Sequence, residues 1–189
     1  MRLLKVEFSW FEDTNFYYAR TNLRFKFEYD AYFCYMSKGA AWISAMRLRT
    51  LPLSLSGIIA GSAVAYYNGS WNALIFGFAI STTILFQIVS NLANDLGDGL
   101  KGTDNEHRVG PERAVQSGVI SSKEMKNGVI VCAILSLVSA GILIYYGTKN
   151  MPTSMIWFYT ALALVCLLAA ITYTVGKKAY GYHGLGDLM

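Results

Sequence analysis

Four long stretches without a charged residue constrain this chain more than any other feature. They cover residues 51–67, 72–93, 129–146 and 154–175. A helix of about 20 residues crosses the roughly 30 Å hydrocarbon core of a bilayer. In a soluble protein, four consecutive uncharged helices would leave no amphipathic helix to cover them. We therefore predict an all-α bundle that spans the membrane several times, with membrane helices at about 51–67, 72–94, 129–146 and 154–175.

The basic residues between these stretches predict how the bundle is oriented. They gather before the first stretch, after the second and after the fourth: Lys38, Arg47, Arg49, Lys101, Arg108, Arg113, Lys123, Lys126, Lys177 and Lys178. The two other connections hold one basic residue, Lys149. The positive-inside rule places the N-terminal side and the connection 95–127 in the cytoplasm of a cell-membrane protein. The net charge of +4 belongs to these connections, so we expect no nucleic-acid partner.

Residues 1–35 differ from the rest of the chain. They carry five basic residues, five acidic residues and 12 of the 27 aromatic residues. They have neither the apolar core of a signal peptide nor a helical or alternating period. We expect this lead to be an upstream-start artefact, with translation beginning at Met36. The alternative is a peripheral tail that lies on the membrane through its aromatic side chains.

A polar stripe runs along the end of the second membrane stretch. Gln87, Asn91, Asp95 and Asp98 are spaced so that they share one face of a helix. Polar groups at this depth are costly and are usually functional. Clustered carboxylates repel one another, and a hard divalent cation such as Mg²⁺ relieves that repulsion through oxygen ligands. The predicted metal ligands are Asn91, Asp95, Asp98 and Asp104.

The connection that follows the stripe adds positive charge and glycines. Lys101, Arg108 and Arg113 lie beside the acids, and basic side chains next to a carboxylate–magnesium site suit a diphosphate. Glycines at 97, 99, 102 and 110 permit close backbone approach. The alternative is a solvated loop whose charges neutralise one another. We favour the diphosphate site because the polar stripe continues into the membrane helix, which a simple linker has no reason to do.

These residues also resemble a known family, the UbiA-type membrane prenyltransferases. The motif is Asn91-x-x-Asn94-Asp95-x-x-Asp98, followed by Lys101-Gly102-x-Asp104-x-x-x-Arg108-x-Gly110-Pro111-x-Arg113. Segments 47–52 and 173–187 resemble the family's entry to its first helix and the segment after its fourth. Gly99 stands at the position where the broader family pattern has its third acid. The nearby acids are Asp98 and Asp104 instead. This arrangement resembles that of the branch that prenylates 1,4-dihydroxy-2-naphthoate in menaquinone biosynthesis. The resemblance covers about residues 36–189.

The resemblance implies a reaction and roles for particular residues. A polyprenyl diphosphate would bind through Mg²⁺ held by Asp95 and its neighbours, with Asp98 as the second catalytic acid. The diphosphate contacts would be Lys101, Arg108, Arg113 and Lys177. The diphosphate leaves, and the aromatic quinone precursor attacks the allylic cation and loses its carboxylate. Tyr173 would face that cation with its ring. Its alternative role is that of a tyrosine in the interfacial belt, and the alternative for Lys177 is an ordinary positive-inside residue.

The resemblance also leaves three alternatives open. The family fold has nine membrane helices and a second aspartate-rich motif, so we expect this chain to correspond to its N-terminal half. It can then be a non-catalytic remnant. Another aromatic acceptor, such as 4-hydroxybenzoate, can replace the naphthoate. A small membrane transporter is the third possibility, but transport sites lie near the midplane of the membrane, whereas these acids gather at a helix end.

Overall fold

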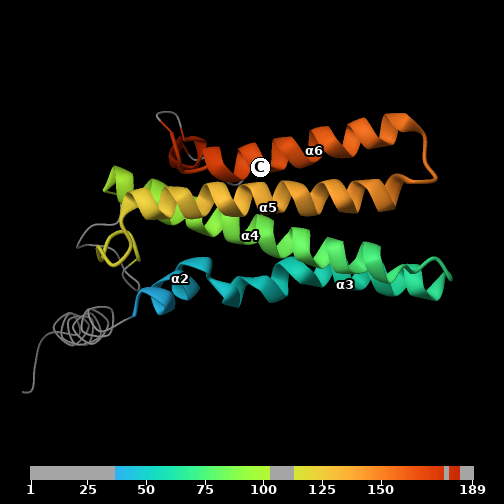
Figure 1. Ribbon diagram of the computed structural model, residues 1–189, viewed down its shortest axis with the longest axis horizontal. Coiled ribbons are helices and arrows are strands. Elements are labelled where there is room, and N and C mark those ends of the chain that lie inside the picture. The colour runs from blue at the N-terminus through green and yellow to red at the C-terminus, as the bar shows by residue number, and fades with distance from the viewer. Residues whose placement is uncertain (1–36, 103–112, 177–178, 184–189) are drawn as a thin grey trace, which may run out of the picture.

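Four long helices lie side by side in the computed structural model, which describes residues 37–102, 113–176 and 179–183 (Figure 1). The helices are α3 (Leu51–Tyr67), α4 (Ala73–Lys101), α5 (Ser122–Thr148) and α6 (Thr153–Thr172). Four helices are long and apolar enough to cross a membrane by length and composition, the first of them counted from α2 through α3. The described residues form helices and turns without a strand, which confirms the predicted all-α class.

The ends of the helices are set by local signals. Asn72 caps α4, because its Oδ1 accepts hydrogen bonds from the backbone N–H groups of Leu74 and Ile75 at 2.9 and 3.2 Å. Gly102 ends the same helix in the left-handed conformation, with φ +65°. Ser121 and Glu124 form a capping box at the start of α5.

Two helix ends differ from the sequence prediction. α4 continues to Lys101, although a connection was expected from residue 95, and α5 begins at Ser122 rather than near residue 129. Hydropathy marks only the apolar part of a helix, whereas backbone hydrogen bonding continues through charged turns. The connection is therefore residues 102–121. Asp95 and Asp98 lie on the last turns of α4, in agreement with the helical spacing that they share with Gln87 and Asn91.

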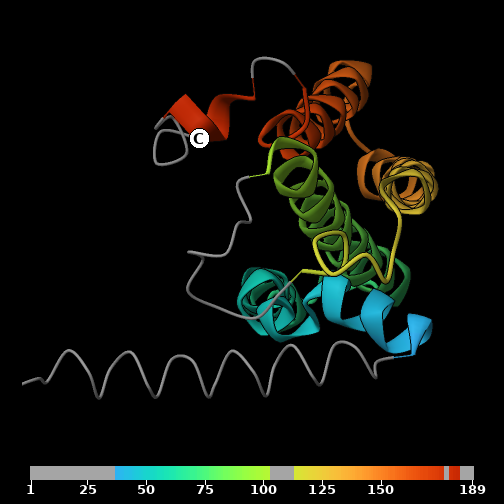
Figure 2. The same ribbon diagram turned by 90° about the vertical axis from the view of Figure 1, so that its left-hand side faces the viewer.

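α4 is the central helix of the bundle. It contacts α3, α5, α6 and a short helix, α2 (Lys38–Met46), as the view along the bundle shows (Figure 2). Its buried residues all lie between Ile88 and Gly97, whereas α3 has none. Large apolar side chains are exposed on the other helices, for example Leu53 and Trp157. Such surfaces suit a lipid environment, and the tightly packed part of the bundle is the half that carries the polar stripe.

α2 is a helix that the sequence did not predict. Ser37 caps it, and Lys38 forms an ion pair with Glu124 of α5 at 2.5 Å. The ring of Trp42 lies over Gly128, where a Cβ atom would come within 2.6 Å of it. Figure 1 shows that α2, the end of α4, the start of α5 and the end of α6 all lie at one end of the bundle. We call this the motif end.

Candidate functional site

Asp95 is the most enclosed acid of the polar stripe. Only 2% of its surface is exposed, and its Oδ1 accepts a hydrogen bond from the backbone N–H of Val115 at 3.4 Å. Val115 itself packs against the last turns of α4, because a Cβ atom at Gly99 would lie 2.6 Å from its side chain. The connection before α5 therefore folds back over the acid and approaches it through its backbone.

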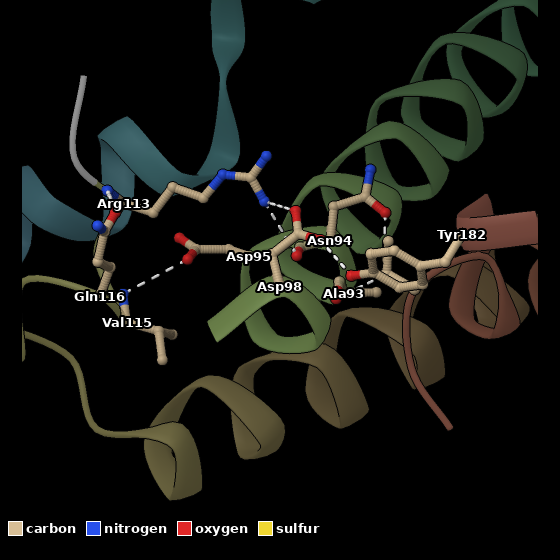
Figure 3. Close-up of polar contacts among 9 residues, drawn as sticks. Ala93, Asn94, Asp95, Asp98, Arg113, Val115, Gln116 and Tyr182 are labelled. Atoms are coloured by element: carbon tan, nitrogen blue, oxygen red, sulfur yellow. Dashed lines mark hydrogen bonds and ion pairs between the residues drawn. The ribbon is translucent and has the colours of Figure 1, made fainter. Parts of the chain in front are cut away.

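Arg113 joins the second acid to the same helix. Its Nη1 donates to Oδ2 of Asp98 and, at 3.1 Å, to the backbone oxygen of Asn94 (Figure 3). Burial lowers the pKa of the Arg113 guanidinium, as does the nearby charge of Arg47, while the charge of Asp95 raises it. A guanidinium stays protonated in proteins despite such a shift. The structure thus brings a permanent cation and the two predicted acids together.

The segment after α6 closes the site from a third direction. Thr174 is buried, and its Oγ1 lies 3.0 Å from the backbone oxygen of Ala93 and 3.1 Å from Oδ1 of Asn94. A Cβ atom at Gly97 would lie 2.6 Å from Thr174, so glycine is required for this close approach. The OH of Tyr182 donates to Oδ1 of Asp98. Figure 3 shows the side chains of α4, the connection and this segment converging.

Lys101 lies at the last residue of α4, next to this cluster. Its Nζ is 3.9 Å from the centre of the Tyr182 ring, within the range of a cation–π interaction. A lysine in the last turn also complements the negative end of the helix dipole. The predicted diphosphate residues Lys101 and Arg113 therefore flank Asp98.

The inner part of the polar stripe forms a chain of hydrogen bonds. Ser54 of α3 donates to Oε1 of Gln87 at 2.7 Å, and Gln87 Nε2 lies 3.5 Å from Oδ1 of Asn91. Asn91 Nδ2 in turn donates to the backbone oxygen of Met46 at 2.8 Å. Asn91 is buried, and its amide connects the end of α2 to α4. The inner part of the predicted stripe is thus a connected network that joins α3, α4 and the end of α2.

Sequence reasoning missed three residues of this site. Arg47 has the left-handed backbone (φ 49°, ψ 52°) that is rare for residues other than glycine, and its charge acts on Asp95 and Arg113. The sequence marks it as a positive-inside residue in the segment that resembles the family's entry to its first helix, without a role in the site. Thr174 and Tyr182 lie in the segment that resembles the family, but their partners on α4 are 80 to 84 residues away in sequence. No spacing pattern links residues so far apart.

The other predicted site residues stand as follows. Tyr173 is the C-cap residue that follows α6, and its ring packs on that of Tyr180, with ring centres 5.3 Å apart. Its backbone oxygen accepts from the N–H of Gly181 at 2.9 Å. Asp104, Arg108 and Lys177 lie outside the described residues, as does the lead 1–35.

The oxygen donors of the site are of the kind that suits a hard divalent cation. Asp95 and Asp98 supply carboxylates, and Asn91 and Asn94 supply amide oxygens. Within the described ranges, no group of three or more His, Cys, Asp or Glu side chains could hold a metal. Magnesium commonly takes one or two protein carboxylates and completes its shell with water and substrate phosphate oxygens. The described residues therefore fit a cation that arrives with a phosphate ligand.

Comparisons with known proteins agree with the motif. The profile of the UbiA prenyltransferase family matches residues 54–188. A 1,4-dihydroxy-2-naphthoate octaprenyltransferase of Haemophilus influenzae is 44% identical over 149 residues, which cover 78% of this chain and 48% of that protein. Proteins of the same name from Escherichia coli and Mycobacterium tuberculosis are 40% and 33% identical, each over 81% of this chain and 49% of their own length. The chain spans about half the length of these relatives. No solved structure matches it.

Proposed function

Because the chain belongs to the UbiA prenyltransferase family, we propose that it serves the transfer of a polyprenyl group from a polyprenyl diphosphate to 1,4-dihydroxy-2-naphthoate. The direct product is demethylmenaquinol, the hydroquinone form of demethylmenaquinone. One observation carries the proposal: two carboxylates, Asp95 and Asp98, lie on the last turns of a membrane helix beside the cations Lys101 and Arg113. The names of the relatives support the naphthoate as acceptor.

The acids would hold the divalent metal that this family generally uses, here taken as Mg²⁺. Asp95 and Asp98 are the principal ligands that we propose, with Asn91 and Asp104 as further predicted ligands. When bound, the metal would stabilise the charge of the departing diphosphate. Asp95 suits this role because its enclosure keeps it in one position, while its backbone contact to Val115 uses only Oδ1.

The cations would bind the diphosphate itself. A guanidinium presents its N–H donors in a planar fork that suits phosphate oxygens, and Arg113, which also contacts Asp98 and Asn94, is the residue that we propose for this role. Lys101 adds a point charge on the neighbouring turn, and Arg47 adds positive charge from the entry to the first membrane helix. Arg108 and Lys177 remain predicted contacts. Together these charges would favour cleavage of the bond between the allylic carbon and the diphosphate oxygen, which leaves both bonding electrons on the diphosphate.

The chemistry then takes place between the two organic substrates. The ring carbon of the naphthoate that bears the carboxylate would form the new C–C bond to the allylic carbon. Loss of that carboxylate as CO₂ returns its bonding electrons to the ring and restores the aromatic system. Tyr173 is the residue that we propose to face the allylic cation. The long apolar tail of the prenyl group would lie along the exposed apolar helices, in contact with lipid.

The orientation of the chain is part of the proposal. The motif end gathers the basic residues that the positive-inside rule places in the cytoplasm. A cytoplasmic motif end would receive both the diphosphate head of the prenyl donor and the water-soluble naphthoate. The protein would then act as a multi-pass protein of the cell membrane whose reaction occurs at the cytoplasmic surface.

Membranes that contain the protein test this proposal. They are supplied with a polyprenyl diphosphate and 1,4-dihydroxy-2-naphthoate. The demethylmenaquinol formed, together with the demethylmenaquinone to which dissolved oxygen converts it, is measured by mass spectrometry. The assay is run on this chain and on a version extended to the length of its relatives, each with Asp95→Ala as control. We expect product that the substitution abolishes. Absence of product from both versions would contradict the proposal.

The acceptor is tested in the same membranes. Equal amounts of 1,4-dihydroxy-2-naphthoate and 4-hydroxybenzoate compete for one prenyl donor, and the two products are quantified together. We expect the naphthoate product to dominate, because every relative reported above is named for that acceptor. If the 4-hydroxybenzoate product dominates, the naphthoate is not the preferred acceptor and the chain is assigned to another branch of the family.

A further inference from the structure

Two contacts of the Tyr182 side chain reach the last turns of α4. Its OH donates to Oδ1 of Asp98 (Figure 3). Its ring faces the ammonium group of Lys101, whose Nζ lies 3.9 Å from the ring centre. The tyrosine belongs to a short 3₁₀ helix, η2 (Tyr180–His183). Because 38% of its surface is exposed, it is not a core residue. Its contacts are therefore those of a side chain directed at the site.

Tyr180 in the same short helix provides the contrast. Its OH donates to the backbone oxygen of Ala169 at 2.8 Å, and its ring packs edge-on against Tyr173. The backbone N–H of Gly181 adds a hydrogen bond to the oxygen of Tyr173 at 2.9 Å. These contacts attach η2 to the end of α6. The attachment does not depend on Tyr182, so its contacts to α4 call for another explanation.

Hydrogen-bond partners of a ligating carboxylate fix its direction, and loss of such a partner typically weakens metal binding or activity by about 10- to 100-fold. Arg113 holds Oδ2 of Asp98, and Tyr182 holds Oδ1. Each carboxylate oxygen has two lone pairs, so Oδ1 can accept the phenol and still bind a cation. The ring meanwhile restricts the flexible side chain of Lys101 to one side of the helix end.

We propose that Tyr182 is a positioning residue for the metal–diphosphate site. Its OH orients the carboxylate of Asp98 toward the metal, and its ring orients the ammonium group of Lys101 toward the diphosphate. The inference rests on the proposed function for the identity of the ligand. It adds that the segment after α6 contributes directly to ligand affinity, and that hydroxyl and ring contribute separately.

The hydroxyl is tested by metal binding rather than by turnover. Purified protein in detergent is titrated with Mn²⁺ in the presence of inorganic diphosphate, and free Mn²⁺ is followed by electron paramagnetic resonance. Tyr182→Phe is expected to raise the dissociation constant of Mn²⁺ about 10-fold or more. Tyr180→Phe removes a hydroxyl from the same short helix and is expected to bind as the wild type does.

The ring is tested with inorganic diphosphate at saturating Mn²⁺. Tyr182→Phe keeps an aromatic face for Lys101, and Tyr182→Leu removes it. We expect Tyr182→Leu to bind diphosphate about 3-fold more weakly than Tyr182→Phe, the range of an exposed cation–π contact. If these two variants bind diphosphate with equal affinity, the ring of Tyr182 does not contribute to diphosphate binding.

The outcomes separate this inference from the proposed function. If the wild type binds Mn²⁺ but the dissociation constant of Tyr182→Phe is within 2-fold of the wild-type value, the role of Tyr182 is overturned and the proposed function is not. The same holds if Tyr180→Phe weakens Mn²⁺ binding as much as Tyr182→Phe does. A wild type that binds no Mn²⁺ would overturn both. If the variants do not fold, the same role can be tested with 3-fluorotyrosine at position 182, which keeps both the hydroxyl and the ring. We expect its ¹⁹F signal to change on addition of Mg²⁺ and diphosphate. An unchanged signal would contradict the inference.

Discussion

The two ends of the helical bundle are built in different ways. At the end with the short connections, polar side chains bond within their own turn: Asn68 to the oxygen of Val64 and Ser70 to that of Ala65. At the motif end, polar side chains connect segments that are far apart, as in the contacts of Asn91 to Met46 and of Tyr182 to Asp98.

The difference also shows in burial. Tyr67 beside the short connection is 89% exposed, whereas Asp95 at the motif end is 2% exposed. Local bonds are sufficient to reverse the chain between two membrane helices. Polar groups that are buried and hydrogen-bond across several segments cost more free energy to bring together. Such groups are typical of a functional site. The comparison predicts that matched substitutions have large effects at the motif end and small effects at the other end.

The largest effect is expected from Asp95→Asn. The amide keeps the size of the side chain and can still accept the hydrogen bond from Val115, but it removes a ligand charge. We expect prenyl transfer to fall by more than about 100-fold, beyond the range for partners outside the ligand shell. The rate is measured in membranes at equal protein amounts. Activity within about 3-fold of wild type would show that Asp95 is not a metal ligand.

Gly97→Ala is expected to have the next largest effect. The added Cβ would lie 2.6 Å from the side chain and the backbone oxygen of Thr174, so α4 and the segment after α6 must separate. Overpacking of this kind lowers the free energy of unfolding by about 1–3 kcal/mol. Gly77→Ala in the same helix is the control, because its Cβ meets nothing within 4 Å. The thermal midpoint in detergent is compared, and equal midpoints would contradict the close approach.

A smaller effect is expected from Thr174→Val. The substitution keeps the branched shape but removes the hydroxyl that reaches Ala93 and Asn94 of α4. A lost hydrogen bond of this type lowers the free energy of unfolding by about 1 kcal/mol. Thr160→Val loses a hydroxyl that bonds only within α6, to the oxygen of Ile156. If both variants unfold at the same temperature, the hydroxyl of Thr174 does not connect the segment after α6 to α4.

The smallest effect is expected from Ser70→Ala at the opposite end. Its hydroxyl bonds to the oxygen of Ala65 in the preceding turn, and the residue is exposed. Exposed substitutions of this kind change the free energy of unfolding by less than about 0.5 kcal/mol. Transfer activity and thermal midpoint should both match the wild type. A loss comparable to that of Thr174→Val would mean that the two ends do not differ as described.

The sequence predicted the helices better than their ends. Uncharged stretches of membrane length revealed the four long helices, and this part of the fold is confirmed. The last turns of α4 carry Asp95, Asp98 and Lys101, and charges on the final turns of a helix resemble those of a loop. The helix α2 was not predicted, because it has only nine residues and is fixed by contacts such as that of Trp42 with Gly128.

The candidate site divides in a similar way. Helical spacing alone indicated that Asn91, Asp95 and Asp98 share a face, and the structure brings Lys101 and Arg113 beside them. Arg47 and Tyr182 were missed because they reach the acids only through tertiary packing.

Chelation of divalent metal tests the central claim most directly. Membranes that form demethylmenaquinol are treated with EDTA, washed and then resupplied with Mg²⁺. The rate is measured at each step for the wild type and for Asp95→Asn. The account predicts that the wild-type rate falls to background with EDTA and returns with Mg²⁺, while the variant stays near background throughout. A wild-type rate that persists in EDTA, or a variant that Mg²⁺ restores to the wild-type rate, would contradict it.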